Sequence, residues 1–539
     1  MKSLRVILAT SFVLSLMVWL IHSMHWWVHL EGDNPLYSVM SMEVLRGKHF
    51  FVTAGQVHGG TPLVYLRAFL FSIFGISTFL GFFVSGVVIA LSVVLWARFA
   101  FLVAGPVAGW VMGVLGAIGT EGFVRPALTD YYGVSLLTGG LLLNAALALA
   151  KRPSFTFRSS FLIGLLAGFA IYICRFSFLY ILSAALFFFA LIPASRRNEL
   201  FPTGIKKSDL LGRVLFYASI AGLLLSIVAF FVSDRFLGIN AEKTLKYSVV
   251  GFAVAWLSQR WKLVLKKAPM LLLAGLGFIL GLLPELAYRL THPAHADRVT
   301  GLVRWGDIAS LLGQLPFRIG FNFSFYHPLT LGLFAVFCWL VVLGLGWYSK
   351  RRLLYAAAFI SAILPIGAWF GIHTYMYLVV QYFFPAFFPL YLALAIAVAL
   401  SKSQKLAAAF VVPVALIGLS DVILNTRQPN PFQESRILER LQEWQDKYDV
   451  KMGFGHYPSN YNLMFAAEGR WKIPFFEADE RFPGFQDEVR REKRIFYIRK
   501  DGDRREPLDI SRYRVLDQAR LSHGFEIKVL EKTFMKDSK

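Results

Sequence analysis

The feature that most constrains this chain is a series of apolar runs, each close to the length that crosses a lipid bilayer. The first covers Val6 to Ile21 and extends to Val28. Further runs lie near 69–95, 99–119, 133–150, 160–173, 176–193, 211–232, 247–259, 268–287, 329–348, 353–371, 383–400 and 406–420. A soluble core could not hide so much apolar surface, because 56% of the 539 residues are hydrophobic. The sequence therefore predicts an all-α polytopic membrane domain with about thirteen transmembrane helices.

The positive charge of the chain is concentrated in alternate turns between these runs. The basic turns contain Arg98; Lys151, Arg152 and Arg158; Arg196, Arg197, Lys206 and Lys207; Arg260, Lys262, Lys266 and Lys267; Lys350, Arg351 and Arg352; and Lys402 and Lys405. Basic turns face the cytoplasm in membrane proteins, so the net charge of +22 reflects topology and leaves no patch for nucleic acid. The pattern predicts a multi-pass membrane protein, surrounded by membrane lipids, with a cytoplasmic N-terminus.

The composition changes near residue 424, after the last apolar run. Residues 1–423 form the predicted transmembrane domain, and residues 424–539 are polar and charged. Ile437, Leu438, Leu441 and Trp444 follow a helical spacing, and the strand-like pieces IFYIRK, YRVLD and FEIKVLEK come later. An odd number of spans places this region outside the cytoplasm, so we predict a C-terminal extracytoplasmic soluble α/β domain.

The first outer loop, residues 30–68, contains a second helical pattern. Leu36, Val39, Met40 and Val44 share one side, which predicts a short helix on the membrane surface, and Gly47 is placed to end it.

Two glycine-containing segments, GLLAG at Gly164–Gly168 and GLGFILG at Gly275–Gly281, have spacings that also occur in nucleotide-binding loops. Both lie inside apolar runs, where small residues allow helices to approach closely, so the interpretation as packing sites is favoured.

The first outer loop carries a family resemblance in three successive segments, GDNPLYSVMSMEVLRGKHF, GQVHGG and YLRAFLFSIFG. They resemble the first extracytoplasmic loop of membrane glycosyltransferases of the GT-C superfamily. The resemblance is closest to the bacterial glycosyltransferase family 39 group, related to protein O-mannosyltransferases and to the aminoarabinose transferase of lipid A. Those proteins have an Asp-Glu pair where this chain has Asp33-Asn34. The segment GHYPSNYNLMFAAEGRWKIPFF resembles the start of their soluble domain.

The resemblance implies transfer of a sugar from a polyprenyl-phosphate donor to a lipid, glycan or protein acceptor. It also implies that the membrane is a bacterial cytoplasmic (inner) membrane. Such a reaction needs a carboxylate that takes the proton of the acceptor hydroxyl, and Asp33 is the predicted general base. One carboxylate that acts on the acceptor predicts inversion at the anomeric carbon.

The leaving lipid phosphate requires cations, because it keeps its negative charge. The predicted donor-phosphate contacts are Arg175, Lys48, Arg46 and Arg67. Arg175 lies between two short apolar runs, where it either serves a polar cavity or caps a turn and extends to water.

Further polar residues on the same side are assigned to the acceptor or the pocket. Asp130 is the predicted supporting catalytic residue, although a structural ion pair with Arg125 is the alternative. The pocket candidates are Glu31, His58, Glu121, Arg125 and His373, and for Glu31 the interpretation as a solvated loop residue is favoured. No cofactor is required, and a divalent cation is compatible with the chemistry although no cluster of carboxylates demands one.

Two other functions remain open on the sequence. A transporter or flippase for a lipid-linked glycan would have ionisable residues deep in its spans and pseudo-symmetric halves. A non-catalytic protein that binds a lipid-linked sugar is compatible with the Asp33-Asn34 departure.

Overall fold

The computed structural model describes residues 2–26, 34–54, 59–118, 130–152, 156–193, 235–236, 239–240, 268–291, 351–371, 387–401, 412, 416, 436–455, 459–474, 482, 484–500, 512–521 and 524–533. Four of the predicted runs, 211–232, 247–259, 329–348 and 406–420, fall wholly or almost wholly outside these residues. The described secondary structure is helical, apart from a two-stranded pair and one small sheet near the C-terminus. The pair consists of β1 (Arg235–Phe236) and β2 (Ile239–Asn240).

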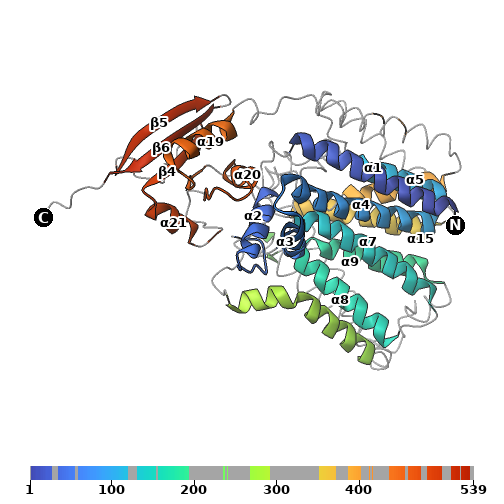
Figure 1. Ribbon diagram of the computed structural model, residues 1–539. Helices are drawn as coiled ribbons and strands as arrows, with labels where there is room; N and C mark the ends of the chain where they lie inside the picture. Colours follow the sequence, from blue (N-terminus) through green and yellow to red (C-terminus); the bar gives the residue numbers. More distant parts are fainter. Residues whose placement is uncertain are drawn as a thin grey trace.

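A bundle of apolar helices makes up the larger part of the molecule (Figure 1). Its members are α1 (Lys2–Trp26), α4 (Thr78–Ala104), α5 (Pro106–Ala117), α7 (Asp130–Lys151), α8 (Phe157–Ile173), α9 (Ser177–Leu191), α15 (Arg352–Gly371), α16 (Phe387–Leu400) and an unlabelled helix, Ala268–Thr291. Within the described residues, α1, α4, α7 and Ala268–Thr291 are long and apolar enough to cross a membrane. The chain is therefore an integral membrane protein, as predicted.

Two of the predicted span boundaries were wrong. The run 69–95 is not one helix, because α3 (Pro62–Phe74) ends at Gly75, which has a φ of +84°, and α4 begins after Ser77. The side chain of Ser77 accepts a hydrogen bond from the backbone of Leu80 and caps the new helix. Helix α4 then continues to Ala104, so Arg98 lies within α4 and not in a turn. From there the Arg98 side chain donates a hydrogen bond to the Asn144 side chain of α7. Apolar composition alone does not reveal these short breaks.

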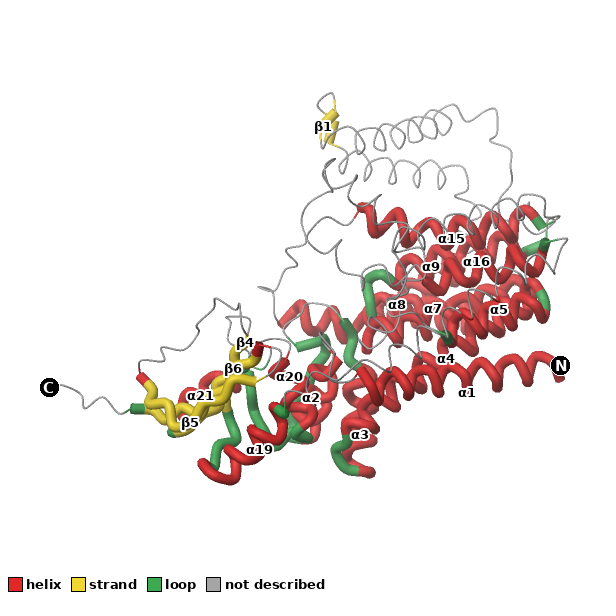
Figure 2. Tube along the Cα trace, turned by 90° about the horizontal axis from the view of Figure 1, so that it is seen from above, coloured by secondary structure: helices red, strands yellow, loops and turns green. Residues whose placement is uncertain are grey.

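Helix α2 (Asn34–Leu45) matches the helix predicted in the first outer loop, and Gly47, with a φ of +89°, follows its end. The expected difference between two faces is absent, because Ser38, Ser41 and Glu43 are buried as completely as Leu36 and Met40. Figure 1 shows the cause, since α2 lies between the end of the bundle and the C-terminal elements. Helix α3 is also at this end, and Figure 2 shows it crosswise to α1 and α4.

The C-terminal elements, from α19 to β6 and called the C-terminal domain below, form a small α/β unit. Its helices are α19 (Ile437–Tyr448), α20 (Ser459–Ala466) and α21 (Phe485–Arg491), and its strands are β3 (Gly453–Phe454), β4 (Arg494–Lys500), β5 (Tyr513–Leu521) and β6 (Phe525–Lys532). The strand order is β3-β4-β6-β5, with β3 parallel to β4 and the other pairs antiparallel. The predicted helix and all three predicted strands are present, and Ile437, Leu441 and Trp444 of the helix are buried on one face as their spacing predicts.

One apolar cluster connects the bundle to the C-terminal domain. It runs from Trp96 in α4 through Met40 in α2 to Trp444 and Phe496 in the C-terminal domain. The C-terminal domain is therefore packed onto the bundle through α2, at the end away from the start of α1 (Figure 1).

Candidate functional site

Several residues predicted to act in the reaction lie outside the described residues: Asp33, Glu31, His58, Glu121, Arg125 and His373. Their roles stay predictions. Their described neighbours nevertheless show which parts of the chain meet.

Segments that adjoin predicted site residues meet near the first turn of α7: two of them contact Tyr131, and the second of these also contacts the end of α8. Tyr37, four residues after Asp33, places its ring edge-on to Tyr131, with 6.2 Å between ring centroids. Gly59, which follows His58, leaves no room for a side chain, because a Cβ there would lie 2.9 Å from the Tyr131 ring. The backbone of Gly60 donates to the carbonyl of Ile173, two residues before Arg175. The first outer loop, the start of α7 and the turn after α8 therefore meet in one place.

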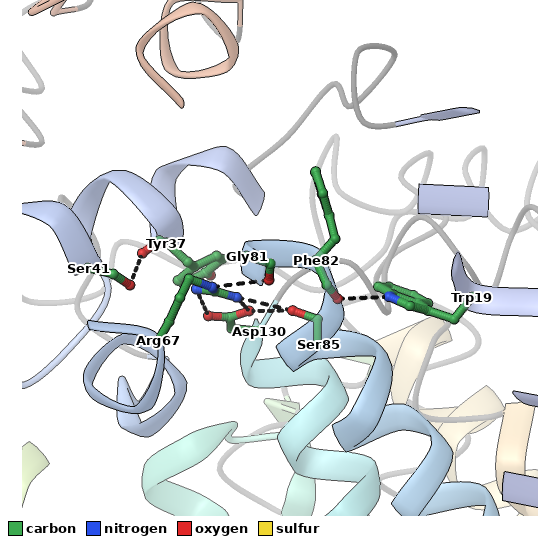
Figure 3. Close-up of polar contacts among 8 residues, drawn as sticks. All are labelled: Trp19, Tyr37, Ser41, Arg67, Gly81, Phe82, Ser85 and Asp130. Carbon is green, nitrogen blue, oxygen red and sulfur yellow. Dashed lines mark hydrogen bonds and ion pairs between the residues drawn. The ribbon is translucent and has the colours of Figure 1, made fainter. Parts of the chain in front are cut away.

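A buried ion pair between Arg67 of α3 and Asp130 of α7 forms the polar centre of this region (Figure 3). Two parallel bonds of 2.8 Å join Nη1 of Arg67 to Oδ2 of Asp130 and Nη2 to Oδ1. Arg67 also donates to the Ser85 hydroxyl at 3.1 Å and, through Nε, to the Gly81 carbonyl at 3.2 Å. Both ions are taken out of water, since the exposed fraction of their side chains is 0% and 2%.

This pair changes the expected partners of both residues. Asp130 has its ion pair with Arg67 of α3, which lies 63 positions away, whereas the sequence pointed to Arg125. Every nitrogen of the Arg67 guanidinium donates to a neighbour within the protein. The donor-phosphate contact predicted for Arg67 stays a prediction, and it would require this pair to open.

Arg46 and Lys48 meet a carboxylate that the sequence interpretation missed. Both side chains form ion pairs with Glu43, at 2.9 Å for Lys48, and the Glu43 side chain is only 1% exposed. The two cations remain about two-fifths exposed and therefore keep access to solvent. The spacing of Glu43 and Arg46, three apart on a predicted helix, was the available signal.

Arg175 lies in the turn between α8 and α9, where it also meets a carboxylate. Its Nη2 is 3.4 Å from Oε1 of Glu285, which Arg289 also approaches, at 3.0 Å. Neither sequence alternative included this partner. Glu285 was detectable in principle, because an acidic residue inside an apolar run is costly unless it is paired.

Within the part of the chain that the structure describes, no three His, Cys, Asp or Glu side chains form a group able to hold a metal ion. The expectation that no cofactor is required, with a divalent cation compatible, stays a prediction.

No family model and no curated protein matches the chain. Among solved structures, the chain is similar to ArnT from Cupriavidus metallidurans bound to undecaprenyl phosphate, with 14% identity and a TM-score of 0.36. It is also similar to the apo state of the same protein, with 13% identity and a TM-score of 0.35. Each match covers 96% of this chain and 97% of the other. These scores are too low for the likeness to assign a family or an activity.

The buried ion pair adjoins a cluster of three tyrosines, because Tyr131 and Tyr132 follow Asp130 in α7 and Tyr37 contacts Tyr131. Such a pair is rigid, because two parallel bonds fix the planes of both groups. It is suited to holding α3, α4 and α7 in a fixed arrangement around the segment that follows Asp33.

Proposed function

We propose that this protein transfers a sugar from a polyprenyl-phosphate carrier to an acceptor at the outer face of a bacterial cytoplasmic membrane. Asp33 acts as the general base and the sugar is inverted. Arg175, Lys48 and Arg46 supply positive charge for the departing phosphate. Arg67 and Asp130 hold the surrounding helices in place, and a contact of Arg67 with the phosphate or of Asp130 with the acceptor would require their ion pair to open.

One observation carries the proposal beyond the resemblance of the first outer loop. The segments adjoining Asp33, His58 and Arg175 meet at the first turn of α7, beside the buried Arg67–Asp130 pair. Residues from separate stretches of the chain must come together for such a reaction, since one base and several cations have to surround one donor. A chance family resemblance in a loop would not predict this convergence.

The substitution Asp33→Asn tests the proposed base with little change in size. We expect the rate of sugar transfer to fall by about 100-fold or more, the usual contribution of a general base. Transfer is measured with synthetic polyprenyl-phosphate-linked hexoses and pentoses added to membranes containing the protein. Binding of undecaprenyl phosphate alone, measured by its effect on melting temperature, should be retained. The exposed residue Asp446 provides the matched control Asp446→Asn.

The same experiment separates the alternatives. An unchanged transfer rate in Asp33→Asn, or retention of configuration in the product, contradicts the mechanism. Binding of the carrier without transfer by the unaltered protein favours a non-catalytic binder. Movement of the lipid-linked sugar across vesicles without a new glycosidic bond favours a flippase.

A further inference from the structure

The C-terminal domain contacts the site region directly, through Phe465 of α20. The Phe465 side chain is buried, and its ring lies against Phe82 of α4 at 5.6 Å between centroids. At the preceding residue, Gly81, an added Cβ would lie 2.6 Å from Cζ of Phe465 and 3.1 Å from Oγ of Ser38 in α2. Phe465 therefore rests on bare backbone of α4, with no space between them.

The backbone that Phe465 covers is the same backbone that binds the buried ion pair. The Gly81 carbonyl accepts a hydrogen bond from Nε of Arg67, and Arg67 in turn holds Asp130 (Figure 3). The next carbonyl, that of Phe82, accepts a bond of 3.0 Å from the indole of Trp19 in α1. Helix α1 leads into the segment containing Asp33. One aromatic ring of the C-terminal domain is thus packed on the two residues that bind Arg67 and α1.

A second set of contacts holds the C-terminal domain at this place. Nη2 of Arg46 donates to the Gly469 carbonyl at 3.0 Å, and Gly469 fits closely, since a Cβ there would lie 3.0 Å from the sulfur of Met42. The Lys48 ammonium lies 4.4 Å from the centre of the Phe485 ring, a favourable cation–π distance. Glu43 pairs with both cations and thereby fixes the side chains that make these contacts.

We infer that the C-terminal domain is a positioning part of the transfer site, and that Phe465 is the positioning residue. By packing on Gly81, Phe465 keeps the Gly81 carbonyl where Arg67 requires it, and so keeps α3, α4 and α7 aligned. The inference rests on the proposed function for its effect on catalysis, but the packing effect on α3 and α4 does not depend on that function.

The test compares Phe465→Ala with Phe496→Ala in the purified full-length protein. Phe496 is equally buried, and its ring packs on Trp471 within the C-terminal domain, so both substitutions remove the same ring from the domain. We expect Phe465→Ala to raise hydrogen exchange in residues 62–74 and 78–86, and Phe496→Ala to leave it unchanged there. In transfer assays with a polyprenyl-phosphate-linked sugar, we expect kcat to fall about tenfold with little change in KM, since small displacements of a site cost rate. Phe465→Leu should restore part of the loss.

A double substitution tests the contact itself. Gly81→Ala adds a methyl group that overlaps the Phe465 ring, so it should disturb exchange in residues 62–74 when introduced alone. Phe465→Ala removes the ring that the added methyl group would overlap. The rise in hydrogen exchange in residues 62–74 caused by Gly81→Ala should therefore be smaller when Phe465→Ala is also present.

Exchange in residues 62–74 and 78–86 that does not respond to Phe465→Ala overturns the inference, whether or not the protein transfers sugar. Raised exchange with unchanged kcat in an active protein overturns the positioning role. Raised exchange in a protein without transfer activity supports the packing effect and contradicts the proposed function alone.

Discussion

Three of the cations predicted to contact the donor phosphate are paired with carboxylates, and two of these carboxylates come from distant segments. Arg67 bonds with Asp130, Lys48 with Glu43, and Arg175 with Glu285. The three cations differ in exposure, because Arg67 is wholly buried whereas Lys48 and Arg175 are about two-fifths exposed. The Lys48 and Arg175 side chains reach solvent and can turn toward a phosphate more readily than Arg67, because separating the wholly buried Arg67–Asp130 pair leaves an unpaired charge in a low-dielectric interior.

The buried pair predicts a separation of stability from activity. Asp130→Asn leaves the Arg67 charge uncompensated and should cost about 3–5 kcal/mol, seen as a lower melting temperature in detergent. The double substitution of Arg67→Met with Asp130→Leu removes both charges and should recover much of that loss. Transfer activity should stay low in the double variant, because the bonds to Ser85 and Gly81 are absent. Recovery of stability and activity together would contradict a positioning role for the pair.

At the scale of elements, close helix packing depends on particular glycines. Cβ atoms added at Gly164 and Gly168 of α8 would lie 1.9 Å from the Ala274 carbonyl oxygen and 2.0 Å from the Phe278 carbonyl oxygen. The reciprocal positions Gly277 and Gly281 are equally restricted by α8. The sequence interpretation of these segments as packing sites is confirmed, because the two backbones cross in direct contact.

The same segment contains a control for this contact. Gly277→Ala should separate α8 from Ala268–Thr291 and lower the melting temperature, since its Cβ would lie 2.3 Å from the Phe161 carbonyl oxygen. Gly275→Ala, two residues earlier, has nothing within 4 Å and should have little effect or a small stabilising one. Equal effects of the two substitutions would contradict the crossing.

The sheet of the C-terminal domain predicts a dependence of stability on pH. Glu531 of β6 accepts bonds from Arg514 of β5 at 2.6 Å and Arg494 of β4 at 3.1 Å, and these bonds lower the pKa of its carboxyl. A lowered pKa in the folded state stabilises the fold above the unfolded pKa of about 4.3, and the contribution disappears as pH falls through the folded value. Glu531→Gln should have a lower melting temperature than the unaltered protein at pH 7. The difference between the two melting temperatures should be smaller at pH 3.5. The exposed residue Glu439 supplies the control Glu439→Gln.

For the whole molecule, the bundle, α2 and the C-terminal domain form consecutive layers. The start of α1 and the C-terminal domain lie at opposite ends of the bundle (Figure 1). This arrangement agrees with a chain that begins on one side of the membrane and ends in a domain on the other. The basic turns predict that the N-terminus is on the cytoplasmic side and the C-terminal domain on the outer side.

Reporter fusions test this orientation. Alkaline phosphatase fused after Lys539 should be active and green fluorescent protein at the same place should not fluoresce, because the C-terminal domain is predicted outside the cytoplasm. Fusions after Arg152, in a predicted cytoplasmic turn, should give the reverse result. The same reporter responding at both places would contradict the predicted topology.

The sequence alone determined the elements whose signal is local. Apolar runs predicted the bundle helices, and the spacing of Ile437, Leu441 and Trp444, with the strand-like sequences of β4 and β6, predicted the C-terminal domain. The type of an element, helix or strand, follows from its own pattern of apolar residues, so this information is present within each segment.

The tertiary structure alone decided the partners. No local pattern joins Arg67 to Asp130 or places Phe465 on Gly81, because each contact depends on how separately formed elements pack. The tertiary structure also decided how far α2 is buried. Its sequence predicts one buried face, and the C-terminal domain covers the other face as well. The physical reason is that periodicity specifies which side of an element avoids water, whereas ion pairs and close contacts require the three-dimensional meeting of segments distant in the chain.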